Sequence, residues 1–104
     1  MQRAVEKLLK IAPKITDDLD ETTLDALMDQ LDALQRPVSE ADVAGLISLF
    51  PAEGDTGYGL NWTVLHAIEA CEAWPIWSLL EDRSNEWIDR LAIRLANAGL
   101  HPPG

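Results

Sequence analysis

The chain has 104 residues, 47% of them hydrophobic and 25% charged, which suits a single domain with its own buried core. Its 18 acidic and 8 basic side chains give a net charge of −10, so direct binding to nucleic acid is not expected. No apolar run reaches the roughly 18 residues of a transmembrane helix, and the N-terminal residues lack the apolar core of a signal peptide. We therefore expect neither a membrane span nor a secretory leader, and the single cysteine gives no sign of an oxidising compartment.

The charge is unevenly distributed along the chain. Residues 1–16 hold four basic side chains against Glu6, and residues 83–104 hold three against Glu86 and Asp89. Residues 17–82 hold fifteen acidic side chains against Arg36 alone, a net charge of −14. A central section of this charge repels nucleic acid and attracts a basic partner.

Apolar side chains recur at helical spacing in six segments, and no useful length of the chain alternates with the period of a β-strand. The pattern predicts helices over residues 3–12, 20–35, 40–50, 60–73, 76–81 and 85–97. Ser39 followed by Asp42 predicts a capping box at the start of the third helix, and Gly99 is placed to end the last one. Residues 98–104 are expected to form a frayed tail.

The predicted fold is all-α. It is a single domain over residues 1–104, with five to six amphipathic helices in antiparallel pairs that stack like a short HEAT-like solenoid. The apolar stripe of the second helix, which includes Met28 among its leucines, is expected to face the core. Trp87 and Cys71 lie on apolar helix faces and are also expected to be buried.

A stripe of acidic side chains lies on the second predicted helix, away from its leucines. Its central members are Asp25, Asp29 and Asp32. Glu21 belongs to the same side, and Asp18 extends the stripe if the helix begins early. Aspartate is a poor residue for a helix interior, so helix formation does not explain the stripe. It is a docking surface for a cationic protein, a solvated face, or a face neutralised by the basic side of the first helix.

A second candidate surface begins in the glycine-containing loop at residues 51–59, which carries Glu53, Asp55 and Tyr58. The spacing of its acidic residues does not match a calcium-binding loop, and no Gly-Lys-Ser/Thr follows as in a phosphate-binding loop. The loop is therefore interpreted as a recognition loop or as an ordinary connection between two helices.

Three side chains of the next predicted helix continue this surface. Trp62, His66 and Glu69 lie along one line, opposite the apolar stripe of that helix. A tryptophan in this position is an exposed interface anchor or packs against another helix. The alternative to a binding role is a helix buried on two sides with a structural contact between His66 and Glu69.

The sequence offers little for catalysis. It contains no nucleophile motif and no cluster of cysteine and histidine with the spacing of metal ligands. None of its serines lies in the Asp-Ser-Leu context that an acyl carrier protein needs. We therefore expect no enzyme activity, no cofactor and no metal site.

Residues 58–69 (YGLNWTVLHAIE) and the acidic loop before them resemble a motif of small all-α bacterial immunity proteins. These proteins are antidotes encoded beside polymorphic toxins, including the toxins of contact-dependent growth inhibition. Residues 86–87 and 94–97 are similar to the closing helix of that family, and the resemblance covers residues 46–98. The acidic loop is shorter than in the family pattern, and Ala96 is smaller than the expected apolar residue.

The resemblance implies a cytoplasmic, non-catalytic protein that binds the C-terminal domain of one cognate toxin and occludes its active site. Many such toxins are nucleases with basic clefts, which an acidic antidote binds with electrostatic steering. Two surfaces are candidates for binding the toxin. The second includes the residues that carry the resemblance, so it is ranked slightly higher. The first is Asp25, Asp29 and Asp32, and the second is Glu53, Asp55, Tyr58, Trp62, His66 and Glu69. The alternative function is an acidic helical adaptor for another basic protein or peptide.

Overall fold

The computed structural model describes residues 1–102, which form five α-helices and one short 3-10 helix and contain no β-strand. The prediction of an all-α fold is therefore confirmed. The elements are α1 (Arg3–Ile11), α2 (Glu21–Asp32), α3 (Glu40–Ile47), α4 (Leu60–Glu69), the 3-10 helix η1 (Trp77–Leu80) and α5 (Glu86–Asn97). Within these residues, no helix combines the length and apolarity needed to cross a bilayer.

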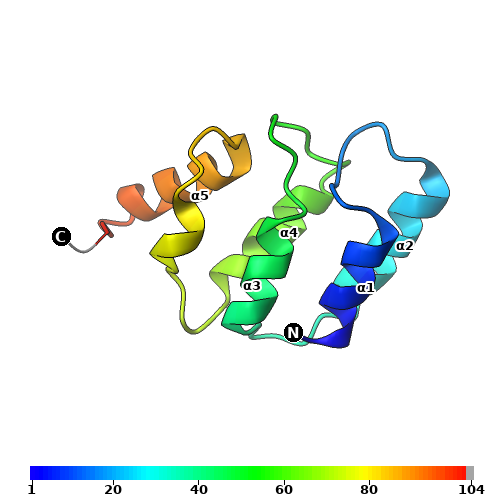
Figure 1. Ribbon diagram of the computed structural model, residues 1–104, viewed down its shortest axis with the longest axis horizontal. Helices are drawn as coiled ribbons and strands as arrows, with labels where there is room; N and C mark the ends of the chain where they lie inside the picture. The colour runs from blue at the N-terminus through cyan, green and yellow to red at the C-terminus, as the bar shows by residue number, and fades with distance from the viewer. Residues whose placement is uncertain (103–104) are drawn as a thin grey trace.

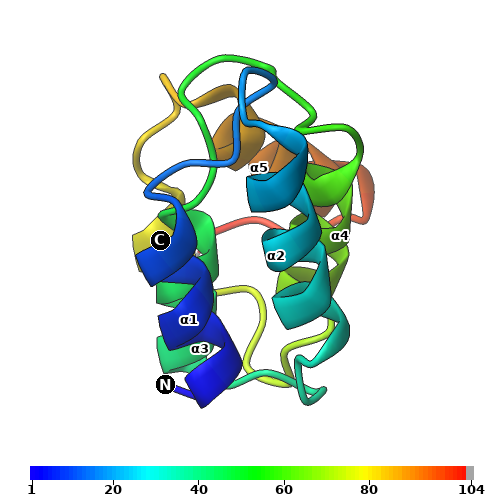
Figure 2. The same ribbon diagram turned by 90° about the vertical axis from the view of Figure 1, so that its right-hand side faces the viewer.

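The first four helices form two antiparallel hairpins that pack against each other (Figure 1). α1 packs against α2 and α3 packs against α4, while contacts also join α1 to α3 and α2 to α4. Corresponding helices of the two hairpins are therefore neighbours, as in stacked helical repeats. η1 and α5 extend the molecule to 44 Å along its longest axis, and α5 crosses the first four helices at an angle (Figures 1 and 2).

Several helices are shorter than the sequence pattern predicts. The predicted helix 20–35 ends at Asp32, because Gln35 turns away to exchange two hydrogen bonds with the side chain of Gln2. The predicted helix 40–50 ends at Ile47. Its last residues tighten into 3-10 bonds, and the carbonyl of Leu49 accepts the amide of Ile15 at 2.8 Å.

The two predicted helices that flank Pro75 are also shorter. The predicted helix 60–73 ends at Glu69, well before Pro75, which disfavours helical backbone at the residue before it. The predicted segment 76–81 is a 3-10 helix limited to Trp77–Leu80. Sequence periodicity therefore located these helices but overestimated their length.

Side chains cap the helices largely as predicted. The capping box of α3 is present: Ser39 Oγ accepts the amide of Asp42, and the Asp42 carboxylate accepts the amide of Ser39. Asp20 accepts the amide of Thr23 at 2.7 Å and caps α2. Gly99 follows the C-cap residue Ala98 of α5, and its φ of 82° is in the left-handed region.

Backbone hydrogen bonds join residues 98–100 to the last turn of α5. The amide of Gly99 donates to Ala96, and the amide of Leu100 donates to Leu95 at 2.9 Å, which closes the last turn of α5. Residues 98–100 therefore belong to the C-terminal cap of α5, and fraying of the tail stays a prediction. The predicted tail also includes residues 103–104, which lie outside the described residues.

The core runs through both hairpins and continues under α5. Trp87 is fully buried and stacks on Phe50 with ring centroids 5.3 Å apart, and Cys71 is buried as a free thiol. Both burial predictions are confirmed. Met28 is 48% exposed, so its predicted place in the core is wrong. α2 buries Leu27 and Leu31 instead, and Met28 lies on the solvent side of that narrow stripe.

Candidate protein-binding surface

Two acidic loops meet at one end of the helical hairpins, at the top of Figure 1: residues 13–20 between α1 and α2, and residues 51–59 between α3 and α4. The amide of Gly57 donates to Oδ1 of Asp17 at 2.8 Å. The amide of Asp17 donates in turn to Oδ2 of Asp55 at 3.1 Å. Each loop is therefore held by an aspartate of the other.

Asp55 is also held through its backbone. Its carbonyl oxygen accepts Nδ2 of Asn61 at 2.9 Å and Nε1 of Trp87 at 2.8 Å. Because its carboxylate and its carbonyl are both engaged inside the protein, Asp55 holds the loop in place. Glu53, two residues earlier, is exposed and remains available to a partner.

Tyr58 projects from an unusual turn. Gly57, Tyr58 and Gly59 have successive φ values of 57°, 55° and 90°, all in the left-handed region. Glycine adopts that region freely, but a tyrosine there is uncommon and strained. Hydrogen bonds from Gly59 to Thr56 and from Leu60 to Gly57 close the turn. The Tyr58 side chain is 72% exposed, so the turn presents an aromatic ring to solvent.

Trp62 lies in the first turn of α4 and is both packed and accessible. Its ring meets Trp87 edge-on with centroids 5.1 Å apart, and its residue is 38% exposed. The guanidinium of Arg90 lies 5.1 Å from the Trp62 ring and 4.3 Å from the Trp87 ring, within range of a cation–π interaction. Trp62 therefore packs against another helix and still exposes part of its surface, and its role as an interface anchor stays a prediction.

Glu69 and His66, the other two predicted site residues of α4, differ in whether their side chains are free to contact a partner. Glu69 accepts Nε and Nη2 of Arg94 at 2.7 and 2.8 Å, a bidentate pair that joins α4 to α5. These hydrogen bonds raise the pKa of Arg94. His66 is exposed, with its Nδ1 3.8 Å from Glu69 and its ring beside Trp62. Glu69 thus joins two helices, whereas His66 faces solvent.

The acidic stripe of α2 is exposed along its length, as Asp25, Asp29 and Asp32 all face solvent. The ion pairs formed within residues 1–102 involve α4, α5 and Arg83, and none of them joins α2 to the lysines of α1. Asp18 does not extend the helix, because α2 begins at Glu21; its carboxylate accepts the hydroxyl of Thr16 instead. The loop at residues 13–20 leads from the start of this stripe to the 51–59 loop, so the two candidate surfaces adjoin.

Sequence reasoning missed three residues of this region. Asn61 is fully buried and joins both loops, and Arg90 and Arg94 line the side of α5 that faces α4. The i, i+4 spacing of the two arginines was a usable signal for a partner helix with acidic or aromatic side chains. Nothing in the local sequence distinguishes Asn61 from an exposed asparagine.

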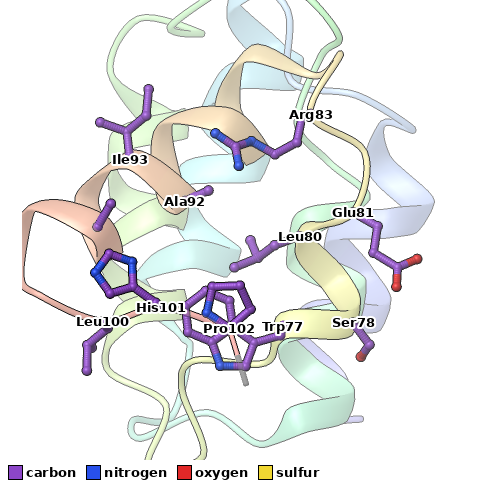
Figure 3. A pocket seen from close by; sticks show the side chains of 11 residues that line it. Trp77, Ser78, Leu80, Glu81, Arg83, Ala92, Ile93, Leu100, His101 and Pro102 are labelled. Atoms are coloured by element: carbon purple, nitrogen blue, oxygen red, sulfur yellow. The ribbon is translucent and has the colours of Figure 1, made fainter. Parts of the chain in front are cut away.

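A separate hollow of about 620 Å³ lies between η1, α5 and the C-terminal segment (Figure 3). Trp77 and Leu80 of η1 face Ala92 and Ile93 of α5, and Pro102 lies along one side. The lining is mainly apolar, and it includes none of the residues predicted to bind a partner. This hollow is therefore distinct from the surface formed by the two loops.

The accessible side chains of the two-loop region include the aromatic ring of Tyr58 and several carboxylates, which suit contact with another protein. Within residues 1–102, no three His, Cys, Asp or Glu side chains are grouped to hold a metal ion. No protein-family model, curated protein or solved structure matches the chain.

Proposed function

We propose that this protein is an immunity protein that acts in the cytoplasm and neutralises a cognate bacterial toxin domain by binding it, without catalysis and without a cofactor. One observation carries the proposal: Tyr58, 72% exposed, is presented by a hydrogen-bonded turn next to exposed carboxylates. Aromatic side chains are frequent binding hot spots, and a turn held in place loses little entropy on binding.

The electrostatics favour a basic partner. The net charge is −10, and the α2 carboxylates lack ion-pair partners within the described part of the chain. Such a surface accelerates encounter with a positively charged protein and repels nucleic acid. The active-site cleft of a nuclease toxin has the complementary charge, because it must bind phosphate groups.

The proposed interface extends from the two loops toward α2 and α4. Tyr58 and Trp62 are the anchors that the partner would bury, and Glu53 and His66 lie around them. The carboxylates of α2 steer the partner: Asp25, Asp29 and Asp32. A surface of this kind placed over a basic cleft excludes the substrate by volume and by charge. Inhibition then needs no chemical step.

Binding to the C-terminal domain of the protein encoded immediately upstream tests the proposal. The two proteins are co-purified and then titrated by calorimetry, and the toxin domain is expressed in cells with and without this protein. Tight one-to-one binding together with restored growth supports an antidote. Growth that is not restored, or the absence of binding, contradicts the proposal and favours the acidic adaptor.

A matched pair of charge reversals locates the interface. Asp29→Lys reverses an exposed charge in the middle of the α2 stripe, and Glu72→Lys reverses an exposed charge just beyond the opposite end of α4. Both variants change the net charge equally. We expect Asp29→Lys to slow association severalfold more than Glu72→Lys, because local charge dominates steering near the contact. Equal effects would place the interface elsewhere.

A further inference from the structure

Asn61 occupies a position that packing alone does not explain. It is fully buried at the start of α4, where its neighbours Leu60 and Val64 supply apolar contacts. Its Oδ1 has no hydrogen-bond partner within the described residues. An unpartnered buried polar atom costs about 1–3 kcal/mol, so the burial of this amide must be offset by the hydrogen bonds that Nδ2 makes.

The amide of Asn61 instead connects the two acidic loops. Nδ2 donates to the carbonyl of Ile15 in one loop and to that of Asp55 in the other, each at 2.9 Å. The backbone amide of Asn61 donates to Thr56 at 3.0 Å. Asn61 therefore holds the 51–59 loop through its backbone amide and through its side chain. Both contacts lie immediately beside the turn that carries Tyr58.

That turn needs such support. A tyrosine with φ of 55° is in a backbone conformation that costs about 1–3 kcal/mol and persists only where surrounding contacts impose it. If the loop were released, Tyr58 would relax toward negative φ and its exposed ring would point in a different direction. The orientation of the exposed ring thus depends on hydrogen bonds made in the interior.

We propose that Asn61 is a positioning residue, which holds the Gly57–Gly59 turn so that Tyr58 is presented in its binding orientation. The inference rests on the proposed function and deepens it by describing the partner surface. A ring on a fixed turn flanked by exposed carboxylates fits a protein surface with a recess for a phenol, bordered by lysine or arginine. Asn61 makes no contact with that partner and acts through Tyr58.

The first test needs no partner. Amide exchange is measured by NMR at Gly57 and Gly59, whose amides donate to Asp17 and Thr56, in the wild type and in Asn61→Leu. Leucine keeps the branched shape of asparagine and removes the Nδ2 donor. Asp42→Asn is the control, because it perturbs a buried polar group at the start of α3, at the other end of the hairpins. We expect exchange at the turn to accelerate about tenfold or more in Asn61→Leu only. Equal rates in the wild type and Asn61→Leu would overturn the proposal.

The second test is a double-mutant cycle in binding to the upstream-encoded toxin domain. We expect Tyr58→Ala to weaken binding about tenfold in the wild type but less than about threefold in Asn61→Leu, because the ring is no longer held in place. Tyr58→Ala and Asp42→Asn should be additive. A purely structural role for Asn61 predicts additivity in both cycles, and that result would overturn the proposal.

The two tests separate the inference from the proposed function. If the wild type does not bind the toxin domain, the proposed function fails, while the exchange measurement still decides whether Asn61 holds the turn. If Asn61→Leu does not fold, Asn61→Ala replaces it. That variant removes the same Nδ2 donor with a smaller side chain, so it should accelerate exchange in the same way.

Discussion

The indole of Trp87 donates its N–H to the carbonyl oxygen of Asp55 at 2.8 Å. Trp87 is fully buried on α5, and Asp55 is half-buried in the acidic loop between α3 and α4. The largest core side chain therefore holds a surface loop as well as filling the interior. This contact couples the packing of α5 to the shape of the proposed binding surface.

Salt should slow the formation of the proposed complex. Exposed carboxylates steer a basic partner only within a Debye length, which shrinks from about 10 Å at 0.1 M salt to about 3 Å at 1 M. We expect the association rate, measured by stopped-flow fluorescence, to fall severalfold over that range while the dissociation rate changes less. An association rate independent of salt would contradict the electrostatic part of the proposal.

Replacing Trp62 should affect both folding and binding. Trp62→Ala removes the edge-on contact with Trp87 and one of the two rings below Arg90. We expect the free energy of unfolding to fall by about 1–2 kcal/mol in chemical denaturation. Trp62→Phe should recover most of that stability.

The same two variants separate the anchor role of Trp62 from its packing role. If Trp62 is an anchor, toxin binding should weaken by about 2 kcal/mol in Trp62→Ala. It should remain weakened in Trp62→Phe, whose smaller ring fills less of the partner surface. Full recovery of binding in Trp62→Phe would instead assign Trp62 to packing alone.

Acid should destabilise the protein through Asp42. Burial opposes ionisation of this carboxyl, but hydrogen bonds from Gln2 and Ser39 outweigh burial and lower its pKa from 3.8 to about 2. Because the folded-state pKa is the lower one, the stabilisation is complete above pH 4–5 and is lost as the pH falls from about 4 toward 2. The shift corresponds to about 2 kcal/mol.

Urea denaturation between pH 2 and pH 6 checks this prediction. The free energy of unfolding of the wild type should fall over the lower part of that range. Between pH 6 and pH 2, the free energy of unfolding of Asp42→Asn should fall by about 2 kcal/mol less than that of the wild type. Asp42→Asn should also be less stable than the wild type at pH 6, since an amide cannot accept all of these hydrogen bonds. Parallel pH profiles would show that Asp42 does not titrate with a lowered pKa.

The pair between Glu69 and Arg94 should contribute little to stability and nothing to binding. Both side chains are partly exposed, with 24% and 42% of their surfaces accessible, so solvent screens the interaction. A double-mutant cycle with Glu69→Gln and Arg94→Gln should give a coupling energy of about 1 kcal/mol or less. A loss of toxin binding in Glu69→Gln, without a change in stability, would return Glu69 to the interface.

Much of the fold could be predicted from local pattern. The all-α class, the capping box at Ser39 and Asp42, the burial of Trp87 and the glycine after α5 all follow from periodicity or from capping chemistry within a few residues. The lengths of the helices could not be predicted in this way. Gln35 leaves its helix because Gln2, 33 residues away, bonds to it.

Some features of the candidate surface could also be predicted from local pattern, and others could not. Exposure of the α2 carboxylates follows from their position opposite the leucines, and it is confirmed. The sequence grouped Asp55 and Glu69 with Tyr58 and Trp62. It could not show that the first two bond to Trp87, Asp17 and Arg94, because those partners are distant in sequence.

The sequence by itself determined the acidic charge, the helical class and most of the residues that the helices bury, because each depends on composition or on spacing within one segment. Only the tertiary structure decided which acidic and aromatic side chains remain free. It places buried Asn61 and Trp87 behind the 51–59 loop and leaves Tyr58 exposed on a left-handed turn. Those outcomes depend on hydrogen bonds between segments 6 to 46 residues apart, and no local pattern encodes such contacts.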